Sequence, residues 1–357
     1  MTMTGGLQTM TADGLGRFSA LQADAVGAVT ERFYATHGSA YQRFGPRGRQ
    51  ACREDLAFHL EFLRPVLEFG LLQPMVDYLR WLASVLAARD IPHEHLAQSL
   101  DWLGEYYAGH LDPADAEIVA GALKAARTAF LESGAAPDPP SPPEPWAGAV
   151  PFEAALLAGR QREALAEVER CLDDGHSLVA VEMHVIQPAL YRIGERWQAN
   201  QVSVAQEHMA TAIARSVMTA GLLRARPPAP NHKKVLLACV EGNNHELGLR
   251  MVADAFSLGG WDVQYLGASV PTAALVQQAS DWQPDLIGLS VSFPQQLRVV
   301  REVIARLPAR AGGGRPPVIV GGLAVNRFTQ LAGVTGADAS SADARSAVAD
   351  GHQLVTA

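Results

Sequence analysis

One histidine, His245, stands where it could bind a metal. It lies in the loop EGNNHELG, residues 241–248, which follows the apolar run VLLACV and precedes a segment of helical periodicity. A neutral imidazole is a common ligand of transition metals. The loop lacks the order GxGxxG, and the histidine occupies the turn where a pyrophosphate needs bare backbone amides, so a dinucleotide site is not expected. A surface or helix-capping role for His245 is the alternative.

Small and polar residues follow two other apolar runs. Ser290 and Ser292 end the run DLIGLSVS, and Gly321 and Gly322 follow the run PVIV. A serine hydroxyl can hydrogen-bond a ligand, and a glycine leaves room for one beside the backbone. Ligands of an open parallel sheet bind beyond the carboxyl ends of its strands. If the runs are parallel strands, these residues and His245 lie on one rim.

The sequence of the C-terminal region, residues 229–357, predicts the strands and helices that would position this rim. The runs VLLACV, WDVQYLG, DLIGLSVS and PVIVGGL have the length of buried strands. Between them, segments such as HELGLRMVADAFSLGG and LRVVREVIARL carry apolar residues at helical spacing. Strands that alternate with helices predict a parallel sheet covered by helices, which is an α/β domain.

The spacing of the rim residues is similar to the cobalamin-binding signature, Asp-x-His-x-x-Gly, Ser-x-Leu and Gly-Gly. The gaps are 41 residues between the first and second groups and 28 between the second and third. The resemblance implies a Rossmann-like domain in which the histidine is the lower cobalt ligand, in place of the cofactor's own dimethylbenzimidazole. The displaced nucleotide tail would enter the edge of the sheet. The residues at the signature positions are Asn243, His245, Gly248, Ser290, Ser292, Gly321 and Gly322.

Two positions depart from that signature. Asn243 replaces the aspartate that hydrogen-bonds the distal histidine nitrogen. An amide oxygen can still orient the ring but adds no negative charge, so we expect a less basic ligand. Ser292 stands where leucine is usual, and we expect this change to affect packing more than coordination.

The middle region, residues 148–228, carries a second signal. Its apolar residues recur at helical spacing and predict a four-helix bundle. Trp197, nine further residues and then Glu207 and His208 resemble the helical cap of cobalamin-dependent photoreceptors of the CarH type. The resemblance implies that these residues enclose a 5′-deoxyadenosyl group, hence adenosylcobalamin. Gln198 stands where that family can carry a second cobalt-binding histidine. The alternative is a core tryptophan and a solvated Glu–His pair.

The N-terminal region, residues 1–135, also predicts helices, and a proline-rich linker at 136–147 follows it. It has no helix-turn-helix signature, unlike CarH-type proteins. Its architecture is similar to that of photocobilins, which implies a bilin such as biliverdin beside the cobalamin. Cys52 could attach a bilin covalently, although noncovalent binding is expected. Core packing is the alternative role for the expected pocket residues, which are His59, Arg64, Tyr78, Arg80, Trp81, Tyr106 and His110.

Composition excludes several classes of protein. Hydrophobic residues make up 48% of the 357-residue chain, which is ample for packed cores. The net charge of −8 provides no attraction to nucleic acid. The three cysteines form neither a CxxC pair nor a disulfide framework. No segment predicts a leader peptide or a membrane span, so a cytoplasmic location is expected.

Together these patterns predict an adenosylcobalamin-binding light sensor rather than an enzyme. Photolysis of the cobalt–carbon bond would repack the cap and change contacts with a separate effector protein or with a second copy of the chain. Two alternatives stay open: a corrinoid methyl carrier of a methyltransferase system, and a cobalamin sensor without photochemistry. An isomerase is less favoured, because the chain has no barrel domain to host radical chemistry.

Overall fold

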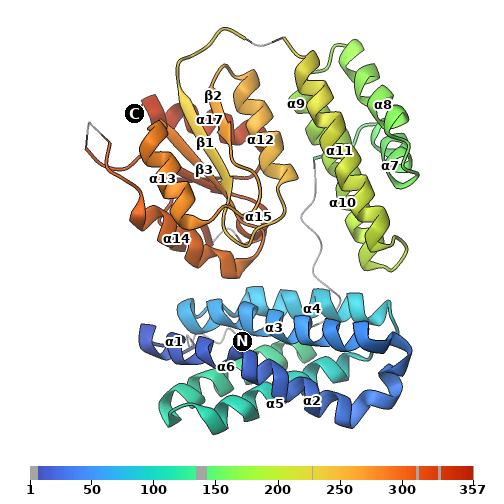
Figure 1. Cartoon of the computed structure of the whole chain (residues 1–357), viewed down its shortest axis with the longest axis vertical. Coiled ribbons are helices and arrows are strands. Elements are labelled where there is room, and N and C mark those ends of the chain that lie inside the picture. Colours follow the sequence, from blue (N-terminus) through green and yellow to red (C-terminus); the bar gives the residue numbers. More distant parts are fainter. Residues whose placement is uncertain (1–6, 134–142, 227, 311–312, 329–330, 357) are drawn as a thin grey trace. The chain divides into compact units, whose positions relative to one another are not determined.

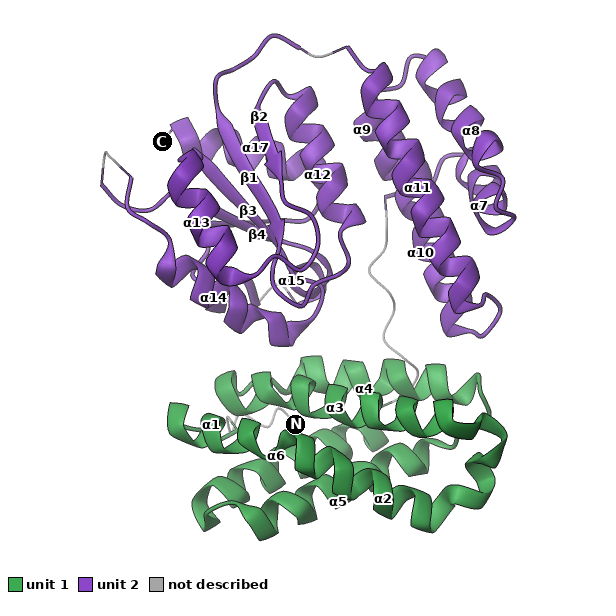
Figure 2. Cartoon of the chain, in the orientation of Figure 1, with its two compact units in different colours: residues 1–138 green, residues 139–357 purple. Residues whose placement is uncertain are grey.

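The computed structural model describes residues 7–133, 143–226, 228–310, 313–328 and 331–356. The chain divides into two compact units, residues 1–138 and 139–357 (Figures 1 and 2). The division falls within the proline-rich segment that we expected to be a linker. Residues 136–142 of that segment lie outside the described residues.

The N-terminal unit is helical, as expected. Leucines of the longest helix, among them Leu60, Leu63 and Leu67, are fully buried, because their spacing of three and four residues places them on one face. That helix ends at Gly70, whose φ of 70° suits glycine. The helices are α1 (Ala12–Ala20), α2 (Gln22–Tyr41), η1 (Gln42–Phe44), α3 (Gly45–Phe69), α4 (Leu72–Ala87), α5 (His93–His110) and α6 (Pro113–Glu132).

The cap is the expected four-helix arrangement, because its third helix is continuous through three assigned segments. Ser203 begins the last helix with a capping box, in which its hydroxyl accepts from the N–H of Gln206 and the Gln206 side chain accepts in return. The segments are α7 (Ala149–Leu157), α8 (Gln161–Asp173), α9 (Leu178–Val181), the π-helical turn η2 (Glu182–Ile186), α10 (Gln187–Gln198) and α11 (Val204–Arg224).

The C-terminal domain contains a five-stranded parallel sheet in the order β2-β1-β3-β4-β5. The expected strands are β1 (Lys234–Cys239), β2 (Asp262–Tyr265), β3 (Leu286–Ser290) and β4 (Val318–Gly321), and β5 (Ala339–Ser341) is an addition. The helices are α12 (Leu247–Leu258), α13 (Thr272–Trp282), η3 (Pro294–Gln296), α14 (Leu297–Arg306), α15 (Leu323–Arg327), α16 (Ala332–Thr335) and α17 (Ala344–Thr356) (Figure 1). This is the Rossmann-like α/β arrangement that the strand–helix alternation predicted.

The cap and the α/β domain share one hydrophobic core. Met251 and Ala255 of α12 are buried in the same cluster as Val181 and Val185 of the cap. We expected a domain boundary between residues 228 and 229, and the structure joins the two sides of it into one compact unit. The cap is therefore held against the sheet domain by apolar packing. Within the described residues, every helix is too short or too polar to cross a membrane.

Candidate functional site

The loop after β1 is held rigidly by the side chain of Asn243, which is fully buried. Its amide oxygen accepts a hydrogen bond from the backbone N–H of His245 at 3.1 Å. Its amide nitrogen donates to the carbonyl of Ser290 at 2.9 Å, which ties the loop to the end of β3. The oxygen that we expected to orient the imidazole therefore fixes the backbone of His245 instead. Asn243 positions the histidine through the main chain.

The imidazole of His245 is exposed at the carboxyl end of the sheet. It lies edge-on to the ring of Phe293, with ring centroids 5.3 Å apart. Nearby protein desolvates the ring and lowers the pKa of His245, while the negative charge of Glu207 acts in the opposite direction. A lowered pKa favours the neutral imidazole, which is the form that binds a metal. The ion pair between Arg215 of α11 and Glu246 places the cap near this loop.

Gln296 joins the two ligand-facing loops and was missed by sequence reasoning. Its amide oxygen accepts from the backbone N–H groups of Ser292 at 2.9 Å and Phe293 at 3.1 Å. Its amide nitrogen donates to the carbonyl of Gly242 at 2.9 Å. One buried glutamine thus sets the β1 loop against the β3 loop. The sequence feature that could have indicated this turn is Pro294, which begins the short 3-10 helix that carries Gln296.

The glycines at the rim have two different roles: the backbone requires glycine at one position, and another glycine leaves open space. At Gly322, φ is 102° and a Cβ would lie 2.4 Å from the carbonyl oxygen of Val291, so the chain itself requires glycine there. At Gly321, a Cβ would lie 3.0 Å from the carbonyl of Ser341. At Gly248, a Cβ would meet nothing within 4 Å, so that glycine leaves open space near the histidine. Ser290 and Ser292, at the same rim, are both buried.

The cap presents the second set of predicted residues. The Glu207 carboxylate accepts from Thr211 Oγ1 at 3.0 Å and lies 2.8 Å from Nδ1 of its neighbour His208. His208 is exposed, whereas Trp197 is partly buried against the cap core. Glu207 and His208 occupy the first turns of α11, one short loop after Trp197 near the end of α10. The structure therefore brings these residues to one end of a helical hairpin.

An ion pair connects the cap to the histidine loop. Arg215 of α11 pairs with Glu246, the residue after His245. Glu246 also accepts a hydrogen bond from the hydroxyl of Tyr265, at the end of β2, at 3.1 Å. Sequence reasoning did not find this contact, because its members are far apart in the chain. It holds α11 over the carboxyl end of the sheet.

The residues expected to line a bilin pocket occupy several separate places in the N-terminal unit. His59 and Tyr78 are both buried, and their side chains hydrogen-bond each other at 2.8 Å. Burial lowers the pKa of His59 to about 3, so the imidazole is neutral. The Trp81 ring is tilted against that of Tyr78 at a centroid distance of 6.2 Å. The structure brings these three residues together as packed side chains.

The remaining members of that set are each engaged locally. Arg64 donates to Ser19 Oγ at 2.6 Å, and Arg80 lies 3.5 Å from the carboxylate of Asp77. Tyr106 and His110 stack with ring centroids 4.0 Å apart on α5. The arginines are partly buried and His110 is exposed. Their role in a bilin site stays a prediction.

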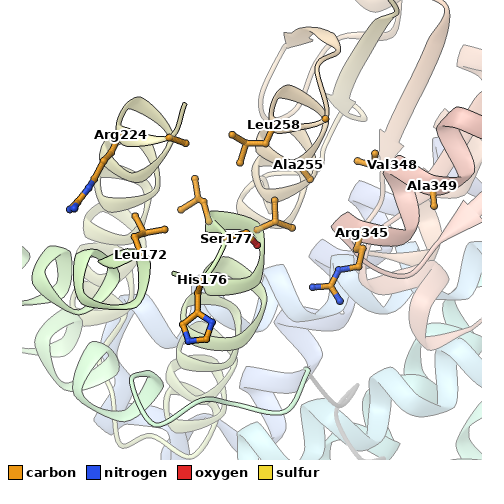
Figure 3. A pocket seen from close by; sticks show the side chains of 13 residues that line it. Leu172, His176, Ser177, Arg224, Ala255, Leu258, Arg345, Val348 and Ala349 are labelled. Carbon is orange, nitrogen blue, oxygen red and sulfur yellow. The ribbon is translucent and has the colours of Figure 1, made fainter. Parts of the chain in front are cut away.

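A groove of about 670 Å³ opens between the cap and the α/β domain (Figure 3). Leu178 of α9, Leu258 of α12 and Val348 of α17 are among the apolar residues that line it. Arg224 and Arg345 also line it, and Arg224 is paired with Glu169 and Asp173. None of the residues predicted to contact cobalamin belongs to this groove.

Comparison with known proteins identifies the ligand class. A B12 binding domain family matches residues 233–350, and a second B12 binding domain family matches residues 151–220. Dimethylamine corrinoid protein 1 of Methanosarcina mazei is 30% identical over 207 residues, which cover 56% of this chain and 93% of that protein. The chain belongs to the family of B12-binding proteins. Cobalamin is therefore its cofactor.

Two further relatives are transcriptional repressors. The transcriptional repressor CarA of Myxococcus xanthus is 35% identical over 163 residues, covering 44% of this chain and 53% of that protein. CarH of the same organism is 34% identical over 140 residues, covering 39% of this chain and 46% of that protein. The chain thus spans about half the length of these two relatives. The solved monomethylamine corrinoid protein of Methanosarcina barkeri aligns with 57% of this chain and 96% of its own, with 18% identity and a TM-score of 0.47.

The donor set of the site fits this cofactor. An exposed imidazole of lowered pKa suits cobalt, and the open space at Gly248 leaves room beside it. We expect His245 to be the residue that holds the metal. The roles assigned to Trp197, Glu207 and His208 stay predictions.

Proposed function

We propose that this protein is a light sensor that binds adenosylcobalamin between its cap and its α/β domain. The observation that carries the proposal is the position of α11 over the carboxyl end of the sheet, where its Arg215 pairs with Glu246, the residue after His245. When bound, adenosylcobalamin supplies a cobalt–carbon bond that light can break. The cap and the histidine loop would then be the parts of the chain that respond.

Each residue of the site has a separate task in this proposal. His245 would hold the cobalt through its neutral imidazole. The indole of Trp197 would pack against the adenosyl group, since aromatic rings stack on nucleobases. Glu207 offers acceptor oxygens and His208 a ring nitrogen to the polar edge of that group. The geometry at Asn243 and Gln296 keeps the lower loop fixed while the cap moves.

The cap and the lower loop are linked in a way that could transmit a change of ligand. Arg215 binds the carboxylate beside His245, and that carboxylate also binds Tyr265. A shift of α11 away from the rim would break the Arg215–Glu246 pair and leave Glu246 with Tyr265. We propose that the signal leaves as altered contact with a separate effector protein or with a second copy of the chain, rather than as an enzymatic reaction.

The leading alternative is a corrinoid methyl carrier. The dimethylamine corrinoid protein from M. mazei, which this chain covers almost completely, favours it. A methyl carrier needs an open upper face so that its partner enzymes reach the methyl group. Trp197, Glu207 and His208 at the end of the cap hairpin favour an enclosed upper face. A cobalamin sensor without photochemistry is the other alternative, and illumination separates it from our proposal.

We expect purified protein loaded with adenosylcobalamin in darkness to change its absorption spectrum permanently under green light. In Trp197→Ala, the preference for adenosylcobalamin over methylcobalamin should fall about 2–12-fold, because an aromatic stacking contact contributes roughly 0.5–1.5 kcal/mol. Affinities for the two cobalamins, measured in darkness by titration, check this ratio.

A matched control is Trp282→Ala. This substitution replaces the last residue of α13, a tryptophan that packs against Lys234 of β1. It should leave the preference unchanged. Transfer of a methyl group to a thiol acceptor, with no preference for the adenosyl form, would support the methyl carrier instead. Stable spectra under light together with tight adenosylcobalamin binding would support the sensor without photochemistry.

We propose further that the N-terminal unit binds a bilin noncovalently. Its support is the helical architecture and the presence of two partly buried arginines, since Arg64 and Arg80 are suited to carboxylates such as bilin propionates. Biliverdin added to the protein should produce a far-red absorption band. Arg64→Ala and Arg80→Ala should each weaken binding about 10–150-fold, because a charged hydrogen bond contributes about 1.5–3 kcal/mol.

The matched control for the bilin is Arg47→Ala, which removes an exposed arginine at the start of α3. Biliverdin titrations followed at the far-red band compare the variants. The bilin proposal fails if no band forms, or if Arg47→Ala weakens binding as much as the other two substitutions. Either result leaves the cobalamin proposal untouched.

A further inference from the structure

Two carboxyl groups face each other where the cap packs against the α/β domain. Glu182 lies on the π-helical turn η2 and Asp254 on α12, and the two side chains are within hydrogen-bonding reach. Glu182 is fully buried and Asp254 is 2% exposed. Both lie where the hydrophobic core passes from the cap to α12. Neither belongs to the site proposed for cobalamin.

The hydrogen-bonding groups around this pair are too few for two negative charges. Among the described residues, neither oxygen of Glu182 has an N–H or O–H donor, and Oδ2 of Asp254 has none either. Oδ1 of Asp254 accepts from Nε of Arg250 at 2.8 Å. One arginine therefore faces two buried carboxyl groups. Burying an unpaired carboxylate is far more unfavourable than protonating it, so one of the two should carry a proton.

The backbone explains why Glu182 is held in this position. Pro188 has no N–H, so it cannot bind the carbonyl of His184 within the helix. The N–H of Trp146 binds that carbonyl instead at 2.9 Å, and the helix widens to a π turn closed by Gln187 and Glu182. The turn and the shared core keep Glu182 facing α12.

We propose that Glu182 is protonated and donates a hydrogen bond to Oδ2 of Asp254, so that one shared proton latches the cap to the α/β domain. Arg250 balances the single negative charge that remains on the pair. This latch concerns the docking of the cap and does not depend on which cobalamin is bound or on photolysis.

The charged groups around the latch give its pH dependence one direction. Desolvation, and then the charge of Asp254, raise the pKa of Glu182 well above its usual value of 4.5, against a smaller opposing effect of Arg250. Desolvation likewise raises the pKa of Asp254. On the other cap elements, Glu153 of α7 is bound by Arg192 and Arg196, and the ring of His184 binds the carbonyl of Glu144. These groups are satisfied elsewhere and do not supply the missing donor.

The direction in which stability changes with pH follows from the raised pKa of Glu182. The folded protein binds the proton more tightly than the unfolded chain, so the latch contributes fully below pH 4.5. Its contribution falls as the pH rises from there through the higher folded pKa. Within that window, each pH unit reduces the folding equilibrium constant by at most about tenfold.

Glu182→Gln in the full-length apo protein tests the latch, because the glutamine amide keeps a donor that cannot be titrated. We expect the Tm of the variant to match that of the wild type near pH 5. Above that pH, the wild type should lose up to about 3–5 °C per pH unit relative to the variant until the folded pKa is passed. Calorimetry from pH 5 to pH 9 measures the Tm of both proteins. Groups elsewhere in the chain titrate in both, so their effects cancel in the difference between the two Tm values.

Glu153→Gln is the matched control, because Glu153 is also buried but accepts from two arginines. It should lower the Tm throughout the pH range. Infrared spectra at pH 7 should show the C=O stretch of a protonated carboxyl in the wild type, and this band should be missing in Glu182→Gln.

Three results would overturn the proposal. The first is a Tm difference between wild type and Glu182→Gln that stays constant with pH. The second is a protonated-carboxyl band that persists in the variant. The third is a wild-type Tm that rises with added Mg²⁺ or Ca²⁺ while that of Glu182→Gln does not, because a cation would then replace the proton. None of these bears on cobalamin binding.

Discussion

His245→Ala is expected to weaken adenosylcobalamin binding at least about 100-fold and to change the spectrum of any cobalamin that remains bound. Loss of a group that only orients a metal ligand reduces metal affinity 10–100-fold, so loss of the ligand itself should reduce it at least as much. The imidazole stands at the carboxyl end of the sheet on a backbone held by Asn243, and alanine leaves that backbone bond intact. Anaerobic titration in darkness, followed by absorption, measures both effects.

The control for this prediction is another exposed histidine of the same unit. His232 lies before β1 with a φ of 62°, a conformation that asparagine tolerates. His232→Asn should bind adenosylcobalamin like the wild type. In His245→Gly, added free imidazole should restore part of the original spectrum, because it can occupy the lower coordination position. Unchanged affinity and spectrum in His245→Ala would show that the lower ligand is another group.

Gly322→Ala is expected to destabilise the cobalamin-binding unit by about 2–5 kcal/mol. The backbone there has a φ of 102°, which is strained for any residue with a Cβ. The added carbon would lie 2.4 Å from the carbonyl oxygen of Val291, a backbone atom that cannot move without disturbing the end of β3. Denaturant unfolding of the apo protein measures the loss.

Gly248→Ala tests whether this glycine is required for the stability of the fold or for binding of the cofactor. This glycine lies in the first turn of α12, and a Cβ there meets no neighbour within 4 Å. Alanine favours helix over glycine by about 0.5–1 kcal/mol, so the apo protein should be equally stable or slightly more stable. Cobalamin affinity should nevertheless fall, because the methyl group occupies space beside His245. An apo protein as unstable as Gly322→Ala would contradict this division of roles.

Much of the fold could be predicted because the relevant interactions are local in the chain. The period of the apolar residues predicted the helices of the N-terminal unit, the four cap helices and four of the five strands. The strand β5 was missed because Ala339–Ser341 has no apolar run, and its pairing with β4 alone makes it a strand. The positions of His245, Ser290 and Gly321 on one rim followed from the rule that parallel strands end on the same side.

The sequence by itself therefore determined which residues form the rim and the cap, and its spacings indicated cobalamin. Only the tertiary structure decided how those parts are held: Gln296 between two loops, Arg215 against Glu246, and Glu182 opposite Asp254. It also showed that His59 and Tyr78 bind each other within a core. The reason is physical. Periodicity records which face of an element is buried, whereas a hydrogen bond between distant residues depends on where folding brings their side chains.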